Sequence, residues 1–110
     1  MVSALSFLSD DIEVFRKILL NHWAAYAQLA AVNALVKIGS EQATNALVEG
    51  LSTDYSTVLR EILIALGRLG NERAIPALEN VSNKPYLSES NIGYLQRTID
   101  AIKSKKNEKP

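Results

Sequence analysis

The fold is decided by residues 58–78, whose sequence reads VLREILIALGRLGNERAIPAL. Leucine and isoleucine recur in its first half at steps of three and four, which is the spacing of one buried helical face. Gly70 ends this helix, because glycine adopts the left-handed conformation of a helix C-cap at no steric cost. A second helix follows at once, with Pro76 in its first turn, where the missing N–H is not needed. The stretch therefore predicts two helices joined by a tight turn.

The same unit occurs more than once in the chain. Residues 34–39 align with residues 65–70 at an offset of 31, and a further copy of the first helix appears at residues 94–102. Residues 10–20 have the pattern of the second helix of a unit. The order is thus half a unit, two whole units and half a unit. We expect an all-α fold, a right-handed α-solenoid of about six helices whose stability comes from stacking.

The boundaries of this solenoid follow from local signals. We expect Asp10 to cap the first helix, with Glu13 closing a capping box, and a short lead-in turn before it. Residues 82–91 are rich in Asn, Ser and Pro and predict a loop, after which the last helix is expected over residues 90–103. One repeat domain then spans residues 1–103, and residues 104–110 form a flexible basic tail. The predicted core residues are Leu35, Ile38, Leu47, Ile62, Leu66, Leu69 and Leu78.

Residues 58–78 resemble a HEAT repeat, and more narrowly the short type named for phycobilisome lyases. That pattern reads valine-arginine, alanine-leucine-glycine, glycine-aspartate and proline-alanine-leucine. The residues that match it are Val58, Arg60, Ala65, Leu66, Gly67, Gly70, Ala74, Pro76, Ala77 and Leu78. The upstream copy has Val36 in place of the first glycine and Asn45 in place of the proline. The resemblance covers residues 24–103 and implies a helical scaffold, a fold that hosts many functions.

Composition narrows the function classes. The chain has 110 residues, and 12 Lys+Arg balance 12 Asp+Glu to a formal net charge of zero. A neutral chain lacks the positive charge that contacts phosphate backbones, so we expect no nucleic acid partner. The absence of cysteine excludes thiolate metal sites and disulfides, and the single histidine, His22, excludes sites with two imidazoles. No apolar run of about 18 residues occurs, so we expect a cytoplasmic protein without a membrane segment.

The sequence contains no catalytic constellation. The acidic residues Asp10, Asp11 and Glu13 lie at a predicted helix start, where capping explains them better than acid–base chemistry. No serine lies in a glycine-flanked elbow, and the five glycines form no phosphate-binding loop. We therefore expect neither an enzyme nor a cofactor or metal site.

Two surfaces are candidates for binding. In stacked helix pairs the second helices line the concave side, and their solvent-facing positions form a stripe. Equivalent positions on that stripe are Lys17, Glu49 and Asn80, with Asn45 one turn before Glu49. This row of mixed polarity suits a folded protein better than a phosphate backbone.

The second candidate is the aromatic cluster of Trp23 and Tyr26 beside His22. These aromatics could anchor a partner, because Trp and Tyr dominate interface energetics. The alternative, which we favour, is that they pack over the first loop between helices. His22 has no second imidazole and no orienting carboxylate within a turn, so we assign it no role as a base or ligand.

The sequence as a whole predicts a non-catalytic protein–protein interaction or scaffold module that binds through its concave face. The resemblance implies one alternative, a bilin-lyase-like chaperone that binds a tetrapyrrole and a phycobiliprotein. We expect protein partners in the first case and a bilin or phycobiliprotein in the second.

Overall fold

The structure of the chain is a computed structural model that describes residues 9–21, 24–53, 55–84 and 87–108. These residues form six α-helices and no strand, and the all-α prediction is confirmed. The helices are α1 (Ser9–Leu20), α2 (Ala25–Ile38), α3 (Glu41–Glu49), α4 (Ser56–Leu69), α5 (Ile75–Val81) and α6 (Glu89–Glu108). Two single-turn 3-10 segments, η1 (Gly50–Ser52) and η2 (Glu72–Ala74), follow α3 and precede α5.

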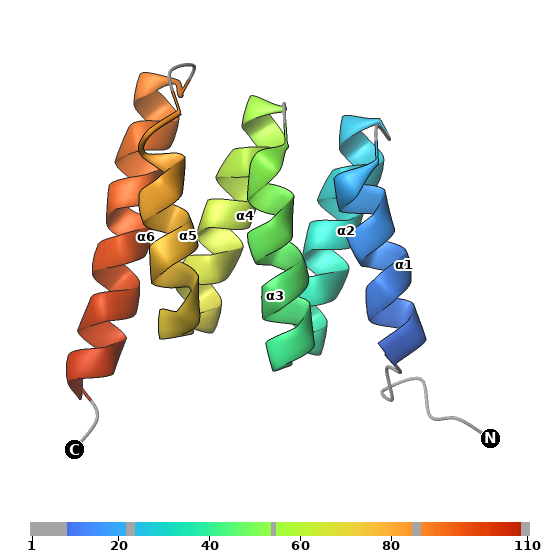
Figure 1. The fold of residues 1–110 in the computed structure, drawn as a ribbon, viewed down its shortest axis with the longest axis horizontal. Coiled ribbons are helices and arrows are strands. Elements are labelled where there is room, and N and C mark those ends of the chain that lie inside the picture. Colours follow the sequence, from blue (N-terminus) through green and yellow to red (C-terminus); the bar gives the residue numbers. More distant parts are fainter. Residues whose placement is uncertain (1–8, 22–23, 54, 85–86, 109–110) are drawn as a thin grey trace.

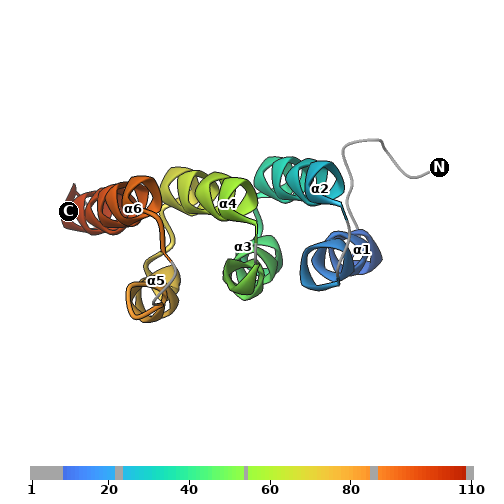
Figure 2. The ribbon, with the colours of Figure 1, turned by 90° about the horizontal axis from the view of Figure 1, so that it is seen from above.

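The helices form two parallel rows. Consecutive helices run antiparallel (Figure 1), and the view from above places α2, α4 and α6 in one row and α1, α3 and α5 in the other (Figure 2). We call these the A row and the B row. The molecule is accordingly a flat stack of 45 × 41 × 17 Å. Helix pairs stacked in this way bury their apolar faces only against their neighbours. The handedness of the stack stays a prediction.

The turns between the rows form as the sequence indicates. Gly39 and Gly70 follow α2 and α4 with φ of 65° and 67°, and their N–H groups donate to the carbonyls of Leu35 and Leu66. Glycine has no Cβ, so this left-handed conformation costs it little. Ser40 then caps α3 by accepting a hydrogen bond from the N–H of Ala43 at 3.1 Å. The first whole unit is thus two helices joined by one tight turn, whereas in the second η2 lies between the capping Gly70 and α5.

The core lies between the two rows. Five of the seven predicted core residues are fully inaccessible to solvent, namely Leu35, Leu47, Ile62, Leu66 and Leu78. The prediction is wrong for Ile38 and Leu69, which are only partly buried. Each is the last residue of its helix, directly before the capping glycine, where fewer neighbours cover the side chain.

Two helix boundaries differ from those expected. Helix α1 begins at Ser9, so Asp10 lies inside the helix rather than at its N-cap, and Glu13 pairs with Arg16 instead of closing a capping box. Helix α6 begins at Glu89 and continues to Glu108, past the expected end at Lys103. The helix continues through this lysine-rich segment because lysine has good helix propensity and no glycine or proline lies between Lys103 and Pro110. The expected lead-in turn lies outside the described residues.

Buried hydrogen bonds connect α4 and α6 within the A row. The Thr98 hydroxyl donates to the carbonyl of Leu63 at 2.8 Å, and the Asn91 amide donates to the carbonyl of Ser56 at 3.1 Å. Thr98 also lies against Gly67, where a Cβ would meet it at 3.8 Å, an ordinary contact. These contacts hold consecutive A helices in register.

Candidate functional site

The four residues of the predicted stripe all lie exposed on the B row. Lys17 comes from α1, Asn45 and Glu49 from α3, and Asn80 from α5. The structure brings Glu49 and Asn80 to one groove, whereas Lys17 and Asn45 do not line it. Two of the four stripe residues therefore line one groove, and whether the four act as one site stays a prediction.

This B-row groove runs between α3 and α5 and has a volume of about 210 Å³. Its apolar residues are Val48, Leu51, Ala77 and Val81, and its polar ones are Glu49, Ser52, Asn80 and Lys84. The Lys84 ammonium donates to the carbonyl of Leu51 at 2.8 Å and so ties the end of α5 to η1. The lining thus combines apolar and polar side chains, as protein interfaces do.

Glu49 forms an ion pair with Arg16, a residue that the sequence analysis did not single out. Arg16 on α1 forms an ion pair with Glu49 through Nε and a second one with Glu13 at 2.8 Å. The hydrogen bond and the charge of Glu49, followed by the charge of Glu13, raise the pKa of Arg16 above its ordinary value. The i, i+3 spacing of Glu13 and Arg16 was a visible signal, but the partner on α3 depends on the register between helices.

A second ion pair crosses the B row at its other end. Arg73 in η2 pairs with Glu41 at the start of α3. Together with Arg16 and Glu49 it links three consecutive elements of the B row through exposed side chains. Exposed pairs of this kind add little stability each, so they set the surface charge pattern more than the fold.

Tyr26 does not pack over the first loop between helices. Its side chain is 80% exposed in the first turn of α2, so the packing interpretation is wrong for this residue. The buried face of α2 includes Gln28, and two residues turn a helix by about 200°, which directs Tyr26 to solvent. Trp23 and His22 lie outside the described residues.

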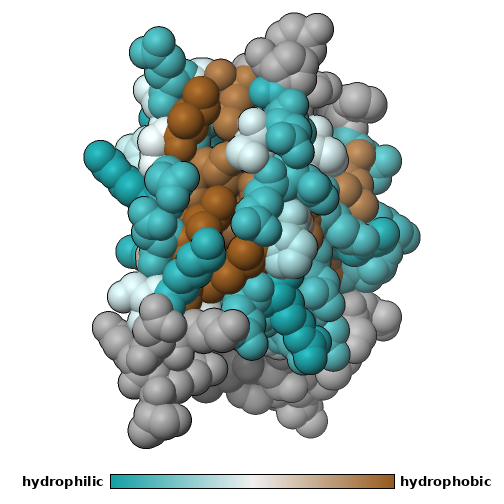
Figure 3. All heavy atoms as spheres, turned by 60° about the vertical axis from the view of Figure 1, so that its left-hand side comes forward, coloured by the Kyte–Doolittle hydropathy of each residue, from teal (hydrophilic) through white to brown (hydrophobic). Residues whose placement is uncertain are grey.

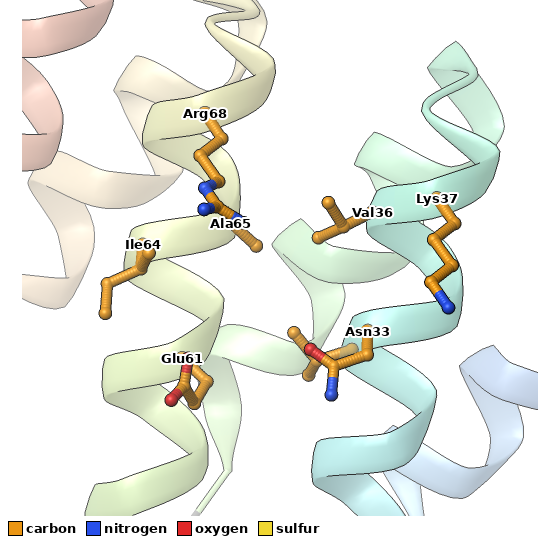
Figure 4. A pocket seen from close by; sticks show the side chains of 8 residues that line it. Asn33, Val36, Lys37, Glu61, Ile64, Ala65 and Arg68 are labelled. Atoms are coloured by element: carbon orange, nitrogen blue, oxygen red, sulfur yellow. The ribbon is translucent and has the colours of Figure 1, made fainter.

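A second groove of about 250 Å³ lies between α2 and α4 in the A row (Figure 4). Val32, Val36, Ile64 and Ala65 supply its apolar lining, and Asn33, Lys37, Glu61 and Arg68 its polar lining. We did not predict this groove. The offset of 31 between Lys37 and Arg68 was the available signal, because it places both cations at the same end of α2 and α4, which are neighbours in the A row.

Among the residues described, no group of three or more His, Cys, Asp or Glu side chains gathers to hold a metal ion. In that same part of the chain, every buried side-chain nitrogen and oxygen has a hydrogen-bond partner. None of the described helices is long and apolar enough to cross a membrane.

Comparison with known proteins identifies the family. The family model of HEAT repeats matches residues 12–89, which extends from α1 to the first residue of α6. No curated protein matches the chain. Since the match covers most of the sequence and the helix pairs are stacked in two rows, the chain belongs to the HEAT-repeat family.

Proposed function

We propose that this chain is a non-catalytic protein–protein interaction module that holds a partner segment on its B-row face, the face expected to be concave. HEAT repeats generally mediate protein–protein interaction or scaffolding. The observation that carries the proposal is the groove between α3 and α5, which is lined by four apolar and four polar residues.

The groove lies between the two shortest of the described α-helices. Helix α3 has nine residues and α5 has seven, whereas α2 and α4 have fourteen each. Helices α3 and α5 stand apart in the view from above, while α4 and α6 lie close together (Figure 2). Val48, Leu51, Ala77 and Val81 therefore line an opening that a partner side chain can fill.

The charges around the groove favour a protein partner. Arg16 offsets the charge of Glu49, and Lys84 is bonded to the Leu51 carbonyl. Asn80 and Ser52 complete the border with groups that donate and accept hydrogen bonds. Such a border suits backbone amides and uncharged side chains, whereas a phosphate backbone requires several cations. We infer that the partner contributes an apolar side chain flanked by exposed backbone.

The bilin-lyase-like role is the alternative, and it rests on the resemblance of residues 58–78 to that repeat type. Ligand pockets for drug-sized molecules enclose about 300–1,000 Å³. The grooves between α2 and α4 and between α3 and α5 measure about 250 and 210 Å³, below that range, and one between α5 and α6 measures about 330 Å³, at its lower limit. These sizes favour a side chain over a whole tetrapyrrole. A visible-absorbance titration with biliverdin separates the two: no saturable spectral shift is expected, and a saturable shift would establish the alternative.

Site-specific crosslinking tests the proposed face. A photo-reactive amino acid at Asn80 is expected to capture a host protein, and the same amino acid at Asn33 in the A-row groove serves as the control. With the captured partner purified, Asn80→Arg is expected to weaken binding at least tenfold, about 1.4 kcal/mol, because the longer side chain fills the groove. Asn33→Arg is expected to leave affinity unchanged. The opposite pattern would move the binding face to the A row.

A further inference from the structure

A third groove lies at the end of the stack, between α5 and α6. It has a volume of about 330 Å³ and an apolar lining of Leu87, Ile92, Leu95 and Ile99. Figure 3, which brings this end forward, shows an apolar strip bordered by polar side chains. The polar lining consists of Glu79, Ser82, Gln96 and Lys103. Ile92 is 52% exposed, which is a high value for an isoleucine among other apolar side chains.

Inside the stack, the equivalent position is filled by a B helix. Helix α3 contacts both α2 and α4, and in the view from above α5 lies between α4 and α6 in the same way (Figure 2). The side chains they insert are buried, as Leu47 and Leu78 show. Among the described residues no B helix lies beyond α6. Ile92 and Leu95 therefore line an open position at the end of the stack, which corresponds to the positions that α3 and α5 occupy inside it.

At the opposite end of the stack, α1 has the complementary arrangement. It is a B helix that packs against α2 and α3, with an A helix on one side only (Figure 2). Val14 on α1 is 55% exposed. It points away from buried Ile12, because two residues turn a helix by about 200°. Helix α1 thus has an apolar residue on its exposed side, and the groove between α5 and α6 lies beside the position where a next B helix would follow.

The charges match as well. Consecutive B helices α1 and α3 are joined by the ion pair of Arg16 with Glu49. The repeat offset that makes Glu49 equivalent to Asn80 and Lys17 makes Arg16 equivalent to Glu79 on α5. If α1 of a second copy followed α5, the residues in these two positions would be Glu79 and Lys17. Both are exposed, and their charges are opposite.

We propose that the groove between α5 and α6 binds α1 of a second copy of this chain, head to tail. Val14 then contacts the apolar lining of this groove, which includes Ile92, and Lys17 of one copy lies opposite Glu79 of the other. The two surfaces differ, so the contact is heterologous and each added copy presents a new open end. This interface is separate from the groove between α3 and α5, and either site can fail without the other.

Sedimentation velocity over a concentration series tests the association. The chain is expected to shift from its monomer mass of 12.1 kDa to larger species as concentration rises. Ile92→Asp is expected to abolish this shift. Because the Ile92 side chain is half exposed, the variant is expected to keep the fold, which circular dichroism checks. Lys37→Glu, an exposed charge reversal on the A row, is the matched control and is expected to have no effect. A chain that stays monomeric up to millimolar concentration overturns the proposal.

Charge reversal tests the orientation. Glu79→Lys and Lys17→Glu are each expected to weaken self-association at least fivefold, because each brings like charges together. A mixture of the two variants is expected to associate as the wild type does, since every contact between unlike chains restores a pair of opposite charges. Failure of the mixture to recover contradicts the head-to-tail arrangement. Deleting residues 1–8 is expected to leave association intact; if it abolishes association while Lys17→Glu does not, the proposed occupant is wrong.

Discussion

The A row and the B row are built from the same repeat but differ in how their helices are joined. Helices α4 and α6 of the A row are joined by buried contacts, among them the hydroxyl of Thr98 on the Leu63 carbonyl. The B row is joined by exposed ion pairs, Arg16 with Glu49 and Arg73 with Glu41, and leaves a groove between α3 and α5. Between consecutive repeats, the A row therefore supplies more of the buried contacts, although side chains of the B row such as Leu47 and Leu78 are fully buried in the core.

The largest effect is expected from the centre of the A row. Leu66→Ala removes a fully buried side chain from α4, which is expected to cost about 2–5 kcal/mol and to unfold much of so small a stack. Leu69→Ala, three residues later on the same helix, is the matched control and is expected to cost clearly less, because Leu69 is only partly buried. Urea unfolding measures both. Equal losses would contradict the assigned core.

Two glycines test separate features: Gly39 tests the backbone strain at a turn, and Gly67 tests how closely α4 and α6 approach. Gly39 has φ of 65° without a steric clash at its Cβ position, so Gly39→Ala is expected to cost about 1–2 kcal/mol through backbone strain alone. Gly67 lies inside α4, and a Cβ there would meet Thr98 at 3.8 Å, an ordinary contact. Gly67→Ala is expected to stabilise the fold by up to about 1 kcal/mol through helix propensity. Thermal unfolding decides the sign, and destabilisation by Gly67→Ala would mean that α4 and α6 lie closer than described.

A smaller loss is expected from the buried hydroxyl that joins α4 and α6. Thr98→Val keeps the shape of the side chain but removes its bond to the Leu63 carbonyl, at an expected cost of about 0.5–1.5 kcal/mol. Thr44→Val is the matched control, since the Thr44 hydroxyl donates to the Ser40 carbonyl of its own helix turn. Bonds of that local kind add little to stability. If the two variants have the same melting temperature, the Thr98 hydroxyl does not contribute to holding α4 and α6 together.

The smallest effect is expected from the B row. Glu49→Gln weakens the ion pair with Arg16 on the exposed surface, so its effect on unfolding is expected to be below that of Thr98→Val. The pKa of Arg16 is raised by Glu49, so this arginine's contribution is present below its ordinary pKa and is lost only at strongly alkaline pH. The effect of Glu49→Gln is therefore expected not to change between neutral and mildly alkaline pH, and to disappear in 1 M salt. A larger loss that persists in salt would assign stability to the B row.

Sequence reasoning predicted what local chemistry determines. The capping glycines Gly39 and Gly70, the turn before Pro76 and the burial of Leu66 follow from period and residue type. Tyr26 was misjudged because a single aromatic residue does not show which side of a helix it occupies.

The grooves and the partner of Arg16 depend on the distance and register between helices that are 33 residues apart in the chain. A repeat pattern gives that register only to within about a residue. The repeat pattern predicted that the four stripe residues are exposed, which is confirmed, but it did not predict that only Glu49 and Asn80 line the groove between α3 and α5.

Native-state hydrogen exchange tests the division between the rows most directly, by comparing α4 with α5 in the same whole repeat. Amides in the centre of α4, around Leu63 and Leu66, are expected to exchange only through global unfolding, because this helix lies between α2 and α6. Amides of the seven-residue α5 are expected to exchange faster, through local opening that leaves the A row intact. Equal protection of α4 and α5 would contradict the account.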